Sequence, residues 1–295
     1  MFKSFLITDR LVIFYVFFCM FWIVIGRNSI TNANILFINY CYVLLYILLI
    51  LILQHFVKNP IVRFIRLWYP LTIIGFFFNS ATQMDMVIFK DYLDPILQHI
   101  DQVLFGYQPA VVWGNAFNGF FIQEFFHFSY FSYYILIFTI PLYVYLSFGN
   151  EEFTRVMFNL LFVFISCYTV YLFLPVVGGR YIPGVQTMTE TYRHGMFTHI
   201  MVYMYRNVSH WGGAFPSSHV AVTFTIWLLS FRYFKKLPWF LLLNLMFLSI
   251  STVFCHYHYF IDVIAGLGYG LVMFGLSELI YAIWGRSKRQ LIVDM

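Results

Sequence analysis

Charge is the scarcest property of this chain. Only 10% of its 295 residues are Asp, Glu, Lys or Arg, whereas an average soluble domain carries roughly 25%. Too few charges are present to cover a surface that faces water, which excludes a water-soluble globular domain and a disordered tail protein. The net charge of +5 is spread among short segments and forms no patch, so a nucleic-acid-binding protein is excluded as well.

Paired cysteines and a signal-peptide cleavage site are also missing. The four cysteines stand singly, and none has a CxxC or other metal-ligand spacing, so they predict no disulfide framework. The first apolar stretch, Leu11 to Ile25, follows Lys3 and Arg10 as in a signal peptide, but no small-x-small motif comes after it. We therefore expect this stretch to remain as the first membrane span.

Hydrophobic residues make up 62% of the chain and occur in long runs. Most runs reach the roughly 20 residues that a helix needs to cross a bilayer. The sequence therefore predicts an all-α, polytopic integral membrane protein with about eight transmembrane helices. The predicted spans are 11–26, 35–57, 64–79, 125–148, 156–177, 217–234, 238–255 and 258–284.

The distribution of basic residues predicts the orientation of the bundle. With a cytoplasmic N-terminus, the inner segments contain 12 of the 17 Lys and Arg residues. The outer segments contain only Arg27, Lys90, Arg180, Arg193 and Arg206. This asymmetry follows the positive-inside rule, and an even number of spans returns the C-terminus to the cytoplasm. We expect both termini of this cell-membrane protein to be cytoplasmic.

Two outer segments are too long to be simple connections, and the first covers about residues 80–124. It contains four acids, Asp85, Asp91, Asp94 and Asp101. Apolar residues in its middle recur at helical spacing, at Ile96, Leu97, Ile100, Val103 and Leu104. This pattern fits either an amphipathic helix on the membrane surface or a structural lid over the bundle, and the sequence favours neither.

The second long segment, 178–216, predicts an anion site. Pro216 suits a first helical position, which would place Ser217, Ser218 and His219 in the first turn, where backbone N–H groups and the helix dipole favour a phosphate. Upstream, Gly178 and Gly179 allow a close backbone approach to a ligand, and Arg180 offers two parallel hydrogen bonds to phosphate oxygens. This arrangement predicts an extracytoplasmic phosphate-binding site.

A histidine and an acid stand four residues apart near the outer end of the last span. This spacing would place His258 and Asp262 on one helical face, so that the carboxylate holds one ring nitrogen and leaves the other electron-rich. A histidine prepared in this way can act as a nucleophile. His219 would face the same cavity and could donate a proton to a leaving oxygen.

These residues resemble a known signature. Pro216-Ser217-x-His219, then His258-x-x-x-Asp262, with Arg180 upstream, is similar to the three-part motif of the type 2 phosphatidic acid phosphatase (PAP2) superfamily. Gly-Ala-Phe-Pro-Ser at 213–217 and His-Tyr-Phe-Ile-Asp at 258–262 look most like its aureobasidin-resistance or inositol-phosphorylceramide synthase branch. The resemblance covers about 125–295, a PAP2-like catalytic core, after transmembrane helices and an extracytoplasmic segment in 1–124.

The resemblance implies a two-step mechanism without metal or other cofactor. His258 would attack phosphorus and Asp262 would orient it, while His219 protonates the departing alkoxide and then activates water or an acceptor hydroxyl. Arg180, Ser217 and Ser218 would hold the phosphoryl oxygens. The implied substrate is a lipid phosphate or phospholipid in the membrane.

The chain departs from the wider superfamily pattern at two basic positions. Phe173 stands where the first motif usually has a lysine, and Thr252 stands where the third usually has an arginine. A pocket with one assured cation suits a phosphodiester better than a dianionic monoester, which favours head-group transfer over hydrolysis. Other positive charge could come from Arg193, Arg206 or His210.

Three alternatives remain beside head-group transfer. The first is a PAP2-type phosphatase that hydrolyses a lipid phosphate monoester or a polyprenyl diphosphate. The second is a metal site that uses His256 with His258, Asp262 and His219, although residues two apart on a helix point to different faces. The third is a transporter, whose polar groups should extend through the whole depth of the bilayer.

Overall fold

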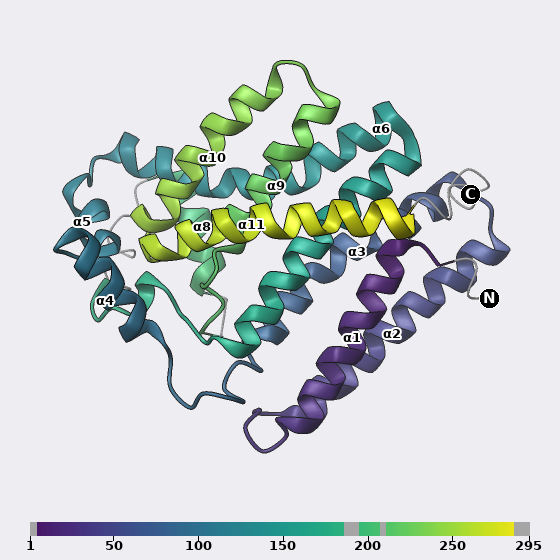
Figure 1. Cartoon of the computed structure of the whole chain (residues 1–295), viewed down its shortest axis with the longest axis horizontal. Coiled ribbons are helices and arrows are strands. Elements are labelled where there is room, and N and C mark those ends of the chain that lie inside the picture. The colour runs from purple at the N-terminus through teal and green to yellow at the C-terminus, as the bar shows by residue number, and fades with distance from the viewer. Residues whose placement is uncertain (1–4, 186–194, 207–210, 286–295) are drawn as a thin grey trace.

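The computed structural model describes residues 5–185, 195–206 and 211–285, and every regular element among them is a helix (Figure 1). The α-helices are α1 (Ile7–Ile25), α2 (Ala33–Phe56), α3 (Pro60–Ala81), α4 (Asp94–Phe105), α5 (Pro109–Ala116), α6 (Phe120–Phe173), α8 (Met196–Arg206), α9 (Ser218–Tyr233), α10 (Leu237–Phe254) and α11 (Phe260–Ile280). Two short elements are η2 (Gly179–Tyr181) and η3 (Tyr281–Gly285). The predicted all-α class is confirmed.

Six of the described helices are long and apolar enough to cross a membrane: α1, α2, α3, α6, α10 and α11 with its extension to Trp284. At 54 residues, α6 would be about 80 Å long if it were straight, far more than the bilayer core of about 30 Å. It breaks at Gly149, whose backbone is not helical (φ 80°, ψ −174°). The predicted span 125–148 therefore lies within α6, and the predicted span 156–177 begins in α6 and runs four residues past its end at Phe173. The shorter α9 occupies the predicted span 217–234.

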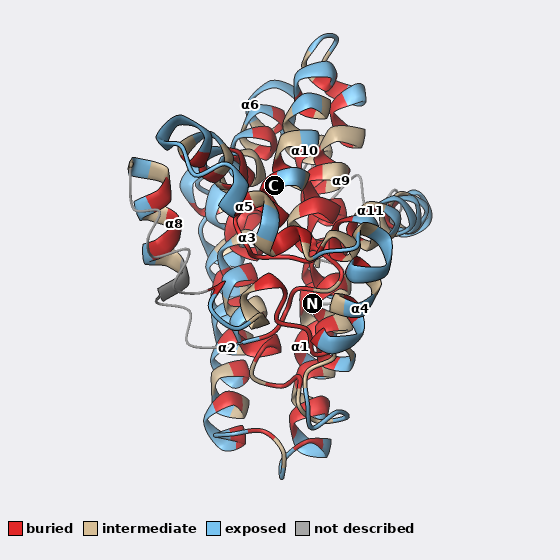
Figure 2. Ribbon diagram, turned by 90° about the vertical axis from the view of Figure 1, so that its left-hand side faces the viewer, coloured by how far each residue is buried: buried red, intermediate tan, exposed pale blue. Residues whose placement is uncertain are grey.

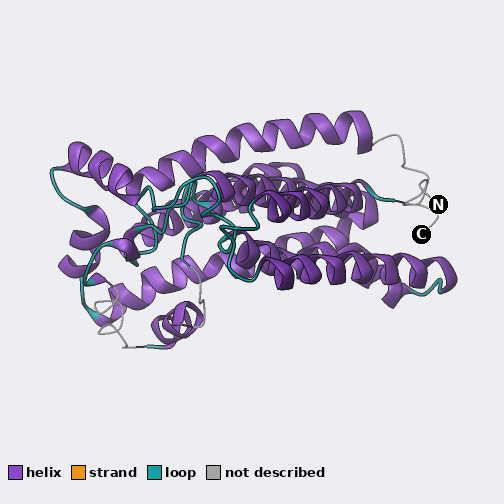
Figure 3. Ribbon diagram, turned by 90° about the horizontal axis from the view of Figure 1, so that it is seen from below, coloured by secondary structure: helices purple, strands orange, loops and turns teal. Residues whose placement is uncertain are grey.

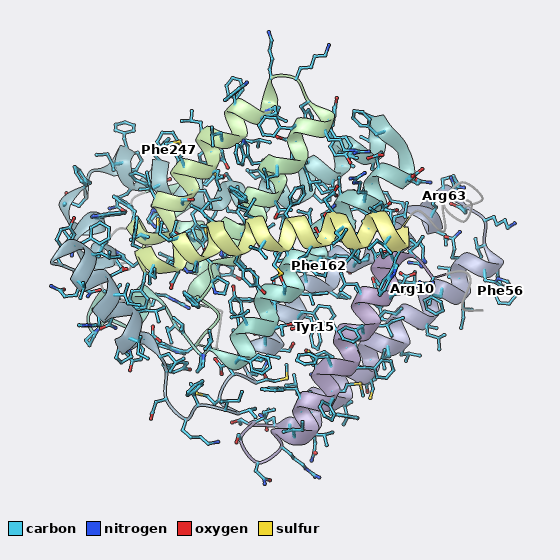
Figure 4. The ribbon with its side chains drawn as sticks, in the orientation of Figure 1. Arg10, Tyr15, Phe56, Arg63, Phe162 and Phe247 are labelled. Atoms are coloured by element: carbon cyan, nitrogen blue, oxygen red, sulfur yellow. The ribbon has the colours of Figure 1, made fainter. Side chains whose placement is uncertain are left out.

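The start of α1 and the end of the last helix lie at one end of the bundle. The helix α1 contacts η3, and Figure 3 shows most of the loops at the opposite end of the bundle. Arg10 and Arg63, two of the predicted inner basic residues, lie at this same end (Figure 4). The predicted even number of spans would produce this arrangement.

The centre of the bundle is α9, which packs against α6, α10 and α11. Two glycines allow α11 to approach it closely: a Cβ at Gly266 would lie 2.8 Å from the carbonyl oxygen of Ser217, and one at Gly270 would lie 2.9 Å from that of Ala221. Seen from the end opposite the termini, burial continues from these helices into the loops between them (Figure 2). These buried loops carry the predicted site.

Candidate active site

Helix α9 begins at Ser218, and Ser217 is its N-cap. The Ser217 hydroxyl oxygen accepts a hydrogen bond from the backbone N–H of Val220, 3.4 Å away. The prediction that Pro216 occupies the first helical position is wrong, because this cap starts the helix two residues later. The first-turn N–H groups are also partly engaged, since Ser217 donates to the carbonyl of Asp262 and Ser218 donates to the Tyr171 hydroxyl.

His258 and Asp262 contact each other, but they do not share a helical face. Helix α11 begins at Phe260, so His258 lies in the turn before it. Within the first turn, Asp262 Oδ2 accepts from the backbone N–H of Tyr259 at 2.9 Å and lies 3.2 Å from His258 Nδ1. The predicted pair is present, and a carboxylate that also caps the helix start holds it in place.

The other ring nitrogen of His258 faces the N-cap of α9. Nδ1 lies 3.2 Å from Asp262, and Nε2 lies 3.3 Å from the Ser217 hydroxyl. The tautomer with its proton on Nδ1, which this carboxylate favours, has its lone pair on Nε2. Burial, and to a lesser degree the Arg180 guanidinium, lower the pKa of His258 to about 3. The imidazole is therefore neutral near pH 7 and its Nε2 is available as a nucleophile.

His219 lies in a pocket of tyrosines beside His258. The hydroxyl of Tyr130 is 3.0 Å from His219 Nε2, and the Tyr133 ring packs against the imidazole with centroids 4.4 Å apart. The rings of His219 and His258 have centroids 5.9 Å apart. The structure thus brings together the two histidines that the sequence assigns to the same reaction.

The segment before η2 passes directly over the turn that carries His258. Gly178 has a φ of +88°, and a Cβ at this position would lie 2.1 Å from the carbonyl oxygen of Tyr257. A Cβ at Gly179 would lie 2.8 Å from the carbonyl oxygen of His256. We expected these glycines to allow a close approach to a ligand, but in the structure they approach the 256–257 backbone. This approach places Arg180 beside His258.

Asp94 and Asp101 of α4 support this site, and the sequence argument did not assign them a role. Both side chains are fully buried. Asp94 accepts from the backbone N–H groups of Val177 and Gly178, each at 2.9 Å, and from the Tyr259 hydroxyl at 2.9 Å. Burial raises the pKa of Asp94, and these hydrogen bonds oppose the rise.

Asp101 supports the start of α11 from outside that helix. Its carboxylate accepts from the backbone N–H groups of Phe260 at 2.8 Å and Ile261 at 3.1 Å. These donors are among the N–H groups that have no partner within the helix. The sequence did contain a signal for this role, because Asp94 and Asp101 stand seven residues apart and so share one face of the predicted amphipathic helix.

The first long segment shows features of both predicted roles. Its helix α4 turns Asp94, Leu97 and Asp101 towards the bundle, as a structural lid would. It also leaves Ile96, Val103 and Leu104 exposed, as a helix on a membrane surface would. Of the other predicted cations, Arg193, His210 and the side chain of Arg206 lie outside the described residues.

His256 points away from the two catalytic candidates. Its Nδ1 hydrogen-bonds to the carbonyl of Ala110 in α5, and a Cβ at Gly114 would lie 2.5 Å from its ring. The metal-site alternative needs His256 as a ligand together with His258, and the observed direction of the ring does not fit that role. Among the described residues, no group of three or more His, Cys, Asp or Glu side chains forms a metal site.

A cavity of about 280 Å³ opens beside His219. Arg180, Ser218 and His219 contribute to its wall, while most of the remaining lining residues are apolar or aromatic. Two of the three residues predicted for phosphate, Arg180 and Ser218, therefore lie at the margin of a space suited to hydrocarbon. A ligand with a phosphate and an apolar tail fits this division.

Comparison with known proteins gives one match. A sequence model described as the PAP2 superfamily matches residues 97–276, more than half of the chain. The match begins in α4, earlier than the expected boundary near residue 125, and it includes all six predicted site residues. No curated protein and no solved structure matches the chain.

Proposed function

The chain belongs to the PAP2 superfamily, and on this premise we propose that it transfers a phospho-head group between lipids through a covalent intermediate on His258. Membership supports a phosphatase-type enzyme that acts on lipids in the membrane. The finer proposal rests on one arrangement: His258 directs Nε2 towards Ser217 and Nδ1 towards Asp262. Its ring centroid lies 5.9 Å from that of His219, which lines an apolar cavity.

In the first step, His258 Nε2 attacks the phosphorus of a phospholipid. The P–N bond forms as the P–O bond to the diacylglycerol oxygen breaks, and the protonated form of His219 gives that oxygen its proton. Asp262 stabilises the positive charge that develops on the His258 ring. The approaching phosphate anion favours the protonated form of His219, because an opposite charge nearby favours the charged form.

In the second step, His219 accepts a proton from the hydroxyl of an acceptor. That oxygen attacks phosphorus, the P–N bond breaks, and His258 returns to its neutral state. With a lipid alcohol as acceptor, the product is a new phospholipid, and with water it is a free phosphorylated head group. Arg180, Ser217 and Ser218 would bind the phosphoryl oxygens in both steps.

Two sequence features favour transfer of a head group. Phe173 and Thr252 stand where two cations usually occur in the wider superfamily, and a phosphodiester carries one negative charge fewer than a monoester. The resemblance to inositol-phosphorylceramide synthases around residues 213–217 and 258–262 suggests inositol phosphate as the group transferred. Hydrolysis of phosphatidic acid or a polyprenyl diphosphate is the alternative. We place the reaction at the outer leaflet, with both termini cytoplasmic, because the basic residues favour that orientation.

Lipid mass spectrometry of products from purified protein tests the proposal. The assay contains a chelator, with phosphatidic acid, polyprenyl diphosphate, and phosphatidylinositol with ceramide or diacylglycerol as substrates. We expect a new head-group lipid from the wild-type protein and from His199→Ala, an exposed histidine on α8, but none from His258→Ala. Release of phosphate alone would replace transfer with phosphatase action, and activity that requires added metal would contradict the histidine mechanism.

A further inference from the structure

One face of α3 forms a wall of the cavity beside His219. The lining residues Leu71, Ile74, Gly75 and Phe78 follow the spacing i, i+3, i+4, i+7, which places them in one row along the helix. Helix α3 precedes the matched residues 97–276. This wall is therefore built by a part of the chain outside the family match.

The facing wall comes from both halves of α6. Tyr133, Ile137, Phe164 and Tyr168 line it. Helices α3 and α6 touch at two levels, where the ring centroids of Trp68 and Phe138 are 5.1 Å apart and those of Phe78 and Tyr168 are 5.7 Å apart. The lining residues Leu71, Ile74 and Gly75 lie between these two ring contacts, and Phe78 takes part in the second. The cavity therefore occupies the space between α3 and α6 from Leu71 to Phe78.

Gly75 keeps this part of the cavity open. A Cβ added at Gly75 would meet no atom within 4 Å. Larger lining side chains, Ile74 and Phe78, stand on either side of it along the row. A side chain introduced at Gly75 would project into empty space, so it would reduce the cavity without disturbing the packing of the helix.

We infer that the cavity face of α3 binds the hydrocarbon tail of the lipid substrate, and that Gly75 determines which tails fit. This inference rests on the proposed function, because the tail is placed by the phosphate at Arg180, Ser218 and His219. The ligand class is a hydrocarbon chain attached close to a phosphate. The apolar lining provides contact area without selecting a head group, so α3 would set tail preference independently of the reaction.

Tail preference is measured with two substrates that share a head group and differ in chain length. For Gly75→Leu, we expect KM for the long-chain substrate to rise about tenfold or more, because small volume changes in an apolar pocket produce effects of this size. KM for a short-chain substrate stays the same, and Gly75→Ala gives an intermediate result. The matched control is Gly268→Leu on α11. A Cβ added at Gly268 also meets nothing within 4 Å, but Gly268 does not line the cavity.

A second measurement does not depend on turnover. A lipid phosphate with a photoreactive group in the middle of its chain is irradiated with the full-length protein, and the labelled peptides are mapped by mass spectrometry. We expect label on residues 71–78 of α3, and less of it in Gly75→Leu. If the wild-type protein labels there yet converts no lipid, the proposed function fails and the tail site stands. Label elsewhere, or an unchanged tail preference in an active Gly75→Leu, overturns the inference.

Discussion

The two ends of the bundle use their carboxylates differently. At the end where α1 begins and α11 ends, acids pair with arginines: Asp9 with Arg66, Glu278 with Arg155, and Glu152 with Arg232. Of these three acids, Asp9 also accepts from a backbone N–H, that of Leu6. At the site end, Asp94, Asp101 and Asp262 accept hydrogen bonds from backbone N–H groups. An ion pair joins two side chains, whereas a carboxylate on N–H groups fixes the course of the backbone. We therefore expect substitutions at the first end to change stability, and those at the site end to change turnover as well.

The largest effect is expected for Asp262→Asn. The amide no longer selects the tautomer of His258 with the proton on Nδ1, so kcat should fall about a thousandfold. The measurement is product formation by lipid mass spectrometry, normalised to folded protein. Asp91→Asn, an exposed acid, is the control and should keep wild-type kcat. A kcat within a factor of three of wild type would remove Asp262 from the mechanism.

At the opposite end, Asp9→Asn should lower stability and leave kcat unchanged. Both partners of the Asp9–Arg66 pair are buried, and Asp9 also accepts from the Tyr69 hydroxyl at 2.6 Å. Loss of one partner leaves a buried charge unpaired, which typically costs about 3–5 kcal/mol. Thermal unfolding in detergent measures this. The double variant with Asp9→Leu and Arg66→Met should recover most of the loss, and a reduced kcat in the folded single variant would contradict the division between the ends.

Asp94→Asn should affect both properties. An amide keeps one acceptor oxygen but loses the charge, so the bonds from Val177, Gly178 and Tyr259 weaken and stability falls by about 2–3 kcal/mol. Because Gly178 lies two residues before Arg180, a looser segment should also raise KM. Unfolding and steady-state kinetics are measured on the same preparation. A loss of stability with an unchanged KM would make Asp94 a structural residue only.

The smallest effect concerns Asp85, a buried acid near the cavity. Its Oδ2 has no hydrogen-bond partner among the residues that the structure describes, and burial raises its pKa to about 7. Because the folded state holds this proton more tightly than the unfolded state, stability should fall as pH rises from about 4 to 7 and then level off. Asp85→Asn should remove that fall, so that the variant is more stable than wild type at pH 8 and gains nothing at pH 4. Unfolding curves at both pH values measure it, and parallel pH profiles would contradict the assignment.

The sequence predicts the helices well because the bilayer imposes one dominant condition, a long apolar run. The predicted span 35–57 differs from α2 by two residues at its start and one at its end. Errors arise where a polar side chain decides the boundary. Ser217 starts α9 after Pro216, and α11 begins at Phe260 beneath a cap from Asp262. Apolar periodicity carries no information about such caps.

The candidate site is predictable where its residues are close in sequence. The spacing of His258 and Asp262 was sufficient to identify the pair, although a turn and a cap bring them together instead of a shared helical face. Asp94 and Asp101 could not be assigned, because their partners lie 83 to 165 residues away in the chain. Only the packing of α4 against α11 reveals which backbone groups these acids hold.

The hydrogen bonds from Asp94 and Asp101 of α4 to the start of α11 also have a consequence for biosynthesis. Asp94 leaves the ribosome long before Tyr259 and Phe260, so the turn that carries His258 gains its support only after the final helix has been inserted. A nascent or truncated chain would possess α4 and Arg180 but not the turn with His258, the proposed nucleophile. Under the proposed mechanism, the chain would therefore be inactive until α11 is in place.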